Sequence, residues 1–224
     1  MLRAVVFDFD GVIANSEPLH YRAFRDVLAD SGVGLSEPEY YQHYLGFDDL
    51  NVFRQLAADR GLTWSTDQIG ALVATKAVRM EHLERDVSIL FPGATALIHR
   101  TSAAVPIAIA SGALRAEIGR ILDREQLTSC FRFVVGAEDT PASKPAPDPY
   151  LRAVALLAPS VDRLRPSECV AIEDSPWGLQ SAHAAGLRTV AVAHTYPSSK
   201  LQADLIVNSL DELDIGTLQR LCAD

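Results

Sequence analysis

A short apolar run near the start of the chain, followed at once by two acids, limits the possible fold more than any other feature. Residues 2–7 are rich in Val and Phe and are interrupted only by Arg3, and the sequence Asp-Phe-Asp-Gly follows at residues 8–11. An apolar run of this length that ends at a turn signal predicts a strand buried on both faces of a parallel sheet. Ligands of open α/β sheets bind beyond the carboxyl ends of the strands, which is where Asp8 and Asp10 are expected.

Asp8 and Asp10 are two residues apart, so at the period of a strand their side chains leave the same face. Like charges that lie close together raise one another's pKa, and burial adds to this effect. A bound cation is the simplest way to keep both carboxylates ionised. An ordinary Asp-Gly turn with both acids in solvent explains the same residues without a cation, so the rest of the chain must decide.

The remaining sequence separates into a helical block and an alternating block. Helical patterns with start and stop signals are expected over residues 16–32, 36–46, 50–61 and 66–85, and their short connections are typical of a small antiparallel bundle. Further strands are expected at residues 105–110, 133–135, 169–172, 189–193 and 205–207, with helices between them and a final helix over 210–221.

This alternation predicts an α/β fold: a Rossmann-like parallel sheet flanked by helices, with a small α-helical bundle inserted after the first strand. The first strand must join the sheet that the later strands form. The expected domains are therefore a core of residues 1–15 and 87–224 and a helical domain of residues 16–86.

Charge and composition narrow the class of partner. The net charge of −9 argues against nucleic acid, which favours a basic surface. No apolar stretch approaches the roughly 20 residues of a membrane helix, and the N-terminus lacks the pattern of a signal peptide. Cys130, Cys169 and Cys222 have no metal-type spacing and suggest reduced thiols. We expect a cytoplasmic monomer with no nucleic-acid or membrane partner.

Polar groups stand at or after four of the expected strands: Asp8 with Asp10, Ser111, Lys144, and Glu173 with Asp174. Each has an ordinary explanation by itself, as a helix cap, a solvated loop lysine or acids at a helix N-terminus. Four such coincidences at one edge of a sheet are hard to produce by capping alone. We therefore interpret them as one site.

The acids of this group suit a magnesium ion. Asp8, Asp174 and the backbone carbonyl of Asp10 offer the hard oxygen ligands that Mg²⁺ prefers. Glu173 can add a ligand or hold a metal-bound water. The sequence thus predicts Mg²⁺ as the cofactor.

The other groups suit a phosphate ester. Ser111 offers a hydroxyl and nearby backbone N–H groups to phosphate oxygens, and Lys144 adds a positive charge. An oxygen of Asp8 can then attack phosphorus and form an aspartyl-phosphate. Asp10 is placed to give a proton to the leaving oxygen.

Four segments carry a specific resemblance: D-F-D-G-V from Asp8, A-S-G around Ser111, S-K-P-A-P-D around Lys144 and E-D-S-P-W-G from Glu173. In order and spacing they resemble the four motifs of the haloacid dehalogenase superfamily, over essentially the whole chain. The helical domain is similar to that family's small α-helical cap. The nearest branch is that of phosphatases and β-phosphoglucomutase-type sugar-phosphate mutases, although the hinge of that branch usually has Asp where this chain has Asn15.

The resemblance implies roles for particular residues. It makes Asp8 the nucleophile and Asp10 the acid/base, gives phosphate binding to Ser111 and Lys144, and gives Mg²⁺ binding to the acids Asp8, Asp10, Glu173 and Asp174. Gly11, Gly112 and His20 are expected substrate contacts. The implied activity is Mg²⁺-dependent hydrolysis of a small phosphorylated metabolite.

A sugar-phosphate mutase is the main alternative. Mutases of this family carry a Lys and an Arg between the second and third cap helices, whereas residues 45–49 here read Leu-Gly-Phe-Asp-Asp. The sequence therefore favours hydrolysis. Dehalogenation would need neither Asp10 nor a metal, and a phospho-acceptor of the receiver type would need no cap. Phosphonate cleavage would need a reactive cap lysine, and Lys76, the only lysine of the cap, is expected to be solvated.

Overall fold

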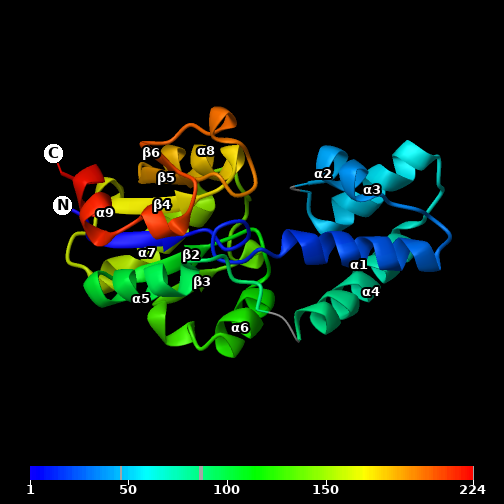
Figure 1. Ribbon diagram of the computed structural model, residues 1–224, viewed down its shortest axis with the longest axis horizontal. Helices are drawn as coiled ribbons and strands as arrows, with labels where there is room; N and C mark the ends of the chain where they lie inside the picture. The colour runs from blue at the N-terminus through cyan, green and yellow to red at the C-terminus, as the bar shows by residue number, and fades with distance from the viewer. Residues whose placement is uncertain (46, 86–87, 224) are drawn as a thin grey trace. The chain divides into compact units, whose positions relative to one another are not determined.

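The structure of the protein, a computed structural model, describes residues 1–45, 47–85 and 88–223 (Figure 1). It divides into two compact units, one of Met1–Asn15 with Leu90–Asp224 and one of Ser16–Ile89. Of the two domain limits predicted from the sequence, the one at residues 86–87 lies outside the described residues, and both limits stay predictions.

A parallel sheet forms the centre of the first unit. Among the described residues it has six strands in the order β3-β2-β1-β4-β5-β6. Their bounds are β1 Ala4–Phe7, β2 Ile107–Ala110, β3 Phe133–Val135, β4 Cys169–Glu173, β5 Arg188–Val192 and β6 Leu205–Val207. Strands β2 and β3 are added on one side of β1 and β4 to β6 on the other, so the strand order reverses between β1 and β4. Ligands of such sheets bind at this position.

Both faces of the sheet are covered, which explains why the strands are apolar throughout rather than alternating. Ala4 and Val6 of β1 belong to the cluster that packs against α7 (Asp148–Leu157) and α8 (Pro176–Ala184), whereas Val5 and Phe7 point to the opposite face. The other helices of this unit are α5 Ala94–Ala104, α6 Arg115–Arg124 and α9 Ile215–Leu221. The Rossmann-like α/β fold predicted from the sequence is confirmed.

The last predicted helix is the clearest error in the element assignment. Residues 210–221 were expected to form one helix, but Leu210–Glu212 is a 3₁₀ turn and α9 begins only at Ile215. The carboxylate of Asp214 accepts a hydrogen bond from the backbone N–H of Thr217 at 2.6 Å and caps α9. An acid at this position starts a new helix in place of continuing the old one.

The second unit contains the helices predicted for the inserted block: α1 Glu17–Asp30, α2 Glu37–His43, α3 Asp49–Arg60 and α4 Thr66–Glu84. Helix α4 packs against both α1 and α3. The apolar core of this unit includes Phe24, Tyr44 and Phe53, each at most 1% exposed. We refer to this unit as the cap.

The core unit holds the two ends of the cap insertion next to each other. Ala14 and Leu90 form an antiparallel bridge, and the backbone N–H of Phe91 donates to the carbonyl of Ile13 at 2.9 Å. The chain therefore leaves the core and re-enters it through two adjacent backbone segments that are hydrogen-bonded to each other.

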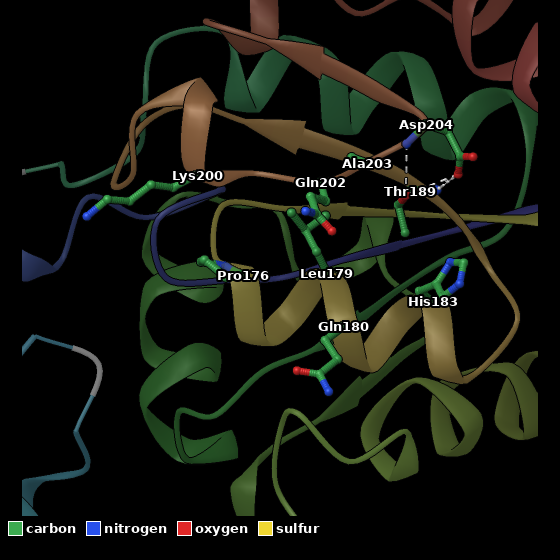
Figure 2. Close-up of a pocket in the computed structure, with 9 residues that line it drawn as sticks. All are labelled: Pro176, Leu179, Gln180, His183, Thr189, Lys200, Gln202, Ala203 and Asp204. Atoms are coloured by element: carbon green, nitrogen blue, oxygen red, sulfur yellow. Dashed lines mark hydrogen bonds between the residues drawn. The ribbon is translucent and has the colours of Figure 1, made fainter.

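Two further features bear on function. None of the helices in the described part of the chain is both long and apolar enough to cross a membrane. A surface groove of about 560 Å³ lies along α8 and is lined in part by His183, Thr189, Lys200 and Asp204 (Figure 2). The residues predicted from the sequence to form the site do not line this groove.

Candidate active site

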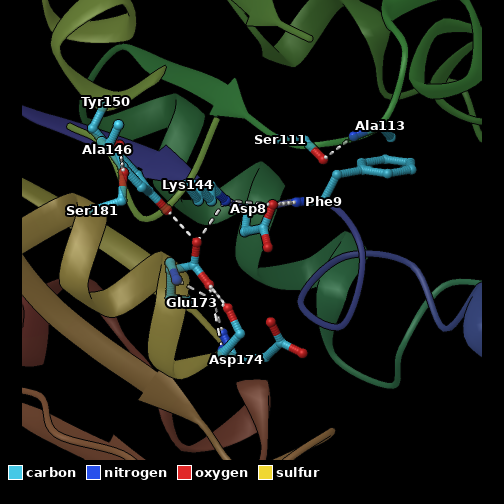
Figure 3. A network of polar contacts seen from close by, with 12 residues as sticks. Asp8, Phe9, Ser111, Ala113, Lys144, Ala146, Tyr150, Glu173, Asp174 and Ser181 are labelled. Carbon is cyan, nitrogen blue, oxygen red and sulfur yellow. Dashed lines mark hydrogen bonds and ion pairs between the residues drawn. The ribbon is translucent and has the colours of Figure 1, made fainter. Parts of the chain in front are cut away.

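Three carboxylates meet at the reversal point of the sheet. Asp8 directly follows β1, Glu173 ends β4, and Asp174 follows it. One oxygen from each lies within 4.8 Å of the others, and all three residues are buried (Figure 3). The neighbouring strands β1 and β4 thus bring together acids that are 165 residues apart in the sequence.

Lys144 joins two of these carboxylates. Its Nζ lies 2.9 Å from Oδ1 of Asp8 and 2.6 Å from Oε1 of Glu173. Burial by itself would lower the pKa of Lys144, but the charges of Asp8 and Glu173 raise it above its usual value. Lys144 therefore keeps its positive charge within the group of acids.

Glu173 is fully buried and accepts hydrogen bonds at both oxygens. Oε1 accepts from Lys144 and, at 2.7 Å, from the hydroxyl of Tyr150, while Oε2 accepts from the backbone N–H of Asp174 at 3.1 Å. The side chain fits because α8 has Gly178 beside it: a Cβ there would lie 1.9 Å from Oε1. These contacts make Glu173 an anchor for Lys144 as much as a possible ligand.

The other two acids are held in an environment that opposes their charge. Burial, with the charge of Glu173, raises the pKa of Asp8 from 3.8 to about 7, although Lys144 acts in the opposite direction. The pKa of Asp174 is also raised, first by burial and then by the charges of Glu173 and Asp8. One lysine does not balance three acids, so the site favours a further positive charge.

Hydrogen bonds give the two oxygens of Asp8 different surroundings. Oδ1 accepts from the backbone N–H of Phe9 at 2.7 Å as well as from Lys144. Both of these donors bind Oδ1. Oδ2 is therefore the oxygen that can bind a ligand or act as a nucleophile.

Ser111 follows β2 and is 3% exposed. Its Oγ accepts from the backbone N–H of Ala113 at 3.1 Å, so its own O–H can donate to an anion (Figure 3). The sequence left open a helix-capping role for Ser111, but the N-cap position of α6 is Leu114. Ser111 therefore lies in the loop before that helix, and Gly112 beside it is exposed.

The loop after Asp8 is closed by the backbone. Asp10 is half-buried and pairs with Ala14 in a bridge, and the N–H of Gly11 donates to the carbonyl of Ala14 at 2.9 Å. Gly11 has a φ of +77°, and a Cβ on it would lie 1.8 Å from Oδ2 of Asp174. Only glycine allows the loop to approach the acids this closely.

His20 belongs to the cap, where it contacts Lys76. The Nζ of Lys76 lies 2.7 Å from Nδ1 of His20 and 2.7 Å from Oδ1 of Asp49. Lys76 is only 1% exposed, so the expectation that it is solvated was wrong. Burial and the charge of Lys76 lower the pKa of His20, which is therefore neutral, with Nδ1 as the acceptor.

A comparison with known families agrees with the motifs. The family model of haloacid dehalogenase-like hydrolases matches residues 5–192, most of the chain. The chain belongs to this family.

Individual relatives of this hydrolase support the assignment over nearly its full length. Hexitol phosphatase B of Escherichia coli (strain K12) is 34% identical over 222 residues, covering 94% of this chain and 93% of that protein. Protein CbbY of Rhodobacter capsulatus is 31% identical, covering 87% of each. The crystal structure of CbbY from Rhodobacter sphaeroides in complex with phosphate matches with a TM-score of 0.86 at 25% identity, covering 98% of this chain and 100% of that chain.

This haloacid dehalogenase-like hydrolase is therefore an enzyme, a phosphoric monoester hydrolase. Sequence reasoning brought Asp8, Lys144 and the acids at the end of β4, Glu173 and Asp174, to one place, and the structure joins them. It missed Tyr150, which lies six residues after Lys144 in the sequence. The apolar pattern of α7 marks Tyr150 as a core residue, and nothing local indicates that its hydroxyl reaches Glu173.

Proposed function

We propose that this enzyme is a Mg²⁺-dependent phosphatase that hydrolyses a small sugar or hexitol phosphate through an aspartyl-phosphate on Asp8. The observation that carries the proposal is the convergence of Asp8, Lys144, Glu173 and Asp174 at the reversal point of the sheet. The relationship to a hexitol phosphatase supports the substrate class. A cytoplasmic location and a monomeric state stay predictions from the sequence.

The residues present suit a magnesium ion. Carboxylate oxygens of Asp8 and Asp174 are close enough to share one ion. The backbone carbonyl of Asp10, predicted from the sequence as a ligand, would add a third hard oxygen. The raised pKa values of Asp8 and Asp174 are those of acids that need a positive neighbour. When bound, the ion would neutralise these acids and the phosphate and so let two anions approach each other.

The protein groups divide the chemistry among them. Lys144 and the O–H of Ser111 hold the phosphate oxygens, and Oδ2 of Asp8 forms a bond to phosphorus as the bond from phosphorus to the sugar oxygen breaks. Asp10, initially protonated, gives its proton to the leaving oxygen. A water then attacks phosphorus, its proton passes to Asp10, and inorganic phosphate leaves Asp8.

The test is a phosphate-release screen with purified protein, using hexitol phosphates, sugar phosphates, nucleotides and small acid phosphates. We expect release with Mg²⁺, none with excess chelator, and recovery when Mg²⁺ is restored. Asp8→Asn, which changes little volume, should reduce release to background. Activity in excess chelator would exclude the metal role, and a folded Asp8→Asn protein with wild-type turnover would exclude the nucleophile.

The structure of the cap supports hydrolysis over mutase activity. A mutase must bind a second phosphate group. The acidic side chains at the start of α3 do not favour the binding of such an anion. Asp48 caps α3 by accepting from the backbone N–H of Asn51 at 2.8 Å, and Asp49 pairs with Lys76, the only lysine of the cap. Gly46, part of the loop on which the sequence argument rested, lies outside the described residues.

The mutase alternative has its own test. Glucose 1-phosphate with a bisphosphate primer should give phosphate and glucose, with little glucose 6-phosphate, because Asp49 already neutralises Lys76. The products can be followed with a coupled dehydrogenase for glucose 6-phosphate and a phosphate assay. Isomerisation faster than phosphate release would show that the chain is a mutase.

A further inference from the structure

The loop that follows β5 contacts the active-site loop, although no sequence motif marks it. The backbone N–H of Ala193 donates to the carbonyl of Val207 at 2.9 Å and fixes the start of this segment against β6. The next two residues, His194 and Thr195, both turn toward Gly11. We call residues 193–195 the post-β5 segment.

His194 is bound to the active-site loop through Gly11. Its Nδ1 lies 2.9 Å from the carbonyl oxygen of Gly11. A carbonyl oxygen only accepts, so Nδ1 carries the hydrogen and donates it. The imidazole stacks on Phe91, with ring centroids 3.9 Å apart and an interplanar angle of 18°. The ring is therefore held in one orientation from two directions.

The hydrogen bond from His194 holds the peptide that follows Gly11, next to the one that carries the Asp10 carbonyl. Gly11 donates its N–H to Ala14 and accepts at its carbonyl from His194. The bond to Ala14 holds the Asp10–Gly11 peptide directly, and the bond from His194 holds the Gly11–Val12 peptide, so rotation about Gly11 is restricted from both sides. The direction of the Asp10 carbonyl, an expected metal ligand, is thus set by the Gly11–Ala14 bond and supported through Gly11 by the His194 bond.

Thr195 acts on the other expected ligand. Its hydroxyl lies beside the carboxylate of Asp174, where it partly opposes the rise that burial causes in the pKa of Asp174. The same hydroxyl oxygen would lie 2.9 Å from a Cβ on Gly11, and Oδ2 of Asp174 would lie 1.8 Å from it. Gly11, Asp174 and Thr195 thus form one close-packed group. The hydroxyl of Thr195 is thus close enough to the carboxylate of Asp174 to act on its orientation.

We infer that His194 and Thr195 are positioning residues that set the direction of two metal ligands, the Asp10 carbonyl and the Asp174 carboxylate. This inference rests on the proposed metal-dependent function. Outer partners of metal ligands fix ligand orientation, and their loss typically costs about 10- to 100-fold in metal affinity or activity. Both residues would act through the metal ligands and not on the substrate.

Direct binding of Mn²⁺ to the whole protein, followed by electron paramagnetic resonance, tests the role of Thr195 without relying on turnover. Thr195→Val removes the hydroxyl at nearly constant volume and should raise the Kd for Mn²⁺ about 10-fold. Thr195→Ser keeps the hydroxyl and should restore wild-type affinity. Equal affinity in the folded Val variant and the wild type would overturn the role of Thr195.

The role of His194 is tested by two matched variants in the same assay. His194→Asn keeps an N–H donor near the position of Nδ1 but loses the ring, whereas His194→Phe keeps the ring stacked on Phe91 and loses the donor. We expect near-wild-type Mn²⁺ affinity in the Asn variant and about 10-fold weaker binding in the Phe variant. The reverse order, or equal affinities, would overturn the role of His194.

The wild-type measurement separates this inference from the proposed function. If wild-type protein binds no Mn²⁺, the metal-dependent function fails and the positioning role fails with it. If wild-type protein binds Mn²⁺ and the Val and Phe variants bind it equally well, the proposed function stands and the positioning role alone is wrong. If a variant does not fold, as judged by circular dichroism, Thr195→Ala and His194→Leu replace it in the same comparison.

Discussion

The two aspartates of the Asp-Phe-Asp-Gly segment differ in their surroundings, and this difference fits the different roles we propose. Asp8 is buried and accepts two hydrogen bonds at one oxygen, whereas Asp10 is half-buried. A nucleophilic carboxylate needs a fixed orientation. The contacts of Phe9 and Lys144 with Oδ1 fix the orientation of the Asp8 carboxylate. An acid/base group needs to exchange protons, which a half-buried position allows.

Replacing Asp10 by Asn should separate the two chemical steps. A sugar alkoxide is a poor leaving group and needs a proton, so its release should fall by about 10²- to 10⁴-fold. Nitrophenolate leaves without a proton, but the phosphoenzyme then waits for a base. With nitrophenyl phosphate, stopped-flow absorbance should show a burst of about one equivalent followed by slow release. Equal losses on both substrates with no burst would give Asp10 a structural role instead.

At the scale of single residues, the sequence identified the site groups at the ends of strands. It did not identify those that reach the site from a helix face or from another loop. Asp8 and Glu173 follow apolar runs, so their position could be predicted. Tyr150 comes from the buried face of a helix and Thr195 from the loop after β5. Their roles depend on contacts across the fold, which local patterns do not contain.

Among the elements, the strands were predictable because each is a short apolar run between turn signals. The errors occurred where a single polar side chain decides where a helix begins or whether a residue is buried. Asp214 divides the expected last helix, and Lys76 is buried because Asp49 and His20 face it from other helices. A helical pattern gives the position of Lys76 along α4 but says nothing about partners on α1 and α3.

The Lys76–Asp49 pair should contribute to the stability of the cap. Asp49→Ala leaves the ammonium of Lys76 buried with one partner fewer, and the free energy of unfolding should fall by about 1–3 kcal/mol. Asp30→Ala is the matched control, because Asp30 pairs with Arg79 at 3.5 Å with both side chains well exposed, and such pairs contribute little. Urea unfolding followed by circular dichroism measures both. Equal losses of unfolding free energy in the two variants would mean that the buried pair contributes no more to stability than the exposed pair.

For the whole molecule, the raised pKa of Asp8 predicts how stability depends on pH without metal. Between pH 3.8, its usual pKa, and about 7, the folded protein holds a proton that the unfolded chain has lost, so Asp8 makes stability fall as pH rises. The raised pKa of Asp174 acts in the same direction. The effect is complete once the pH exceeds the folded values.

Binding of Mg²⁺ should oppose this trend, since the ion needs the deprotonated acids. We expect the melting temperature to rise on addition of Mg²⁺ at pH 8 and to change little at pH 5. Thermal unfolding with Mg²⁺ or chelator across this range measures the difference, and Asp8→Asn should reduce it. A shift of the same size at every pH would mean that the ion binds elsewhere.

The bridge between Ala14 and Leu90 has a consequence for how such a molecule changes over evolutionary time. Because the core itself joins the two ends of the insertion, the segment between them is a replaceable module whose length and sequence the sheet does not constrain. The core retains its carboxylates and its hydrogen bonds whichever module is inserted. Selection can then alter the inserted helices without rebuilding the reaction centre, so that one catalytic apparatus serves many substrates.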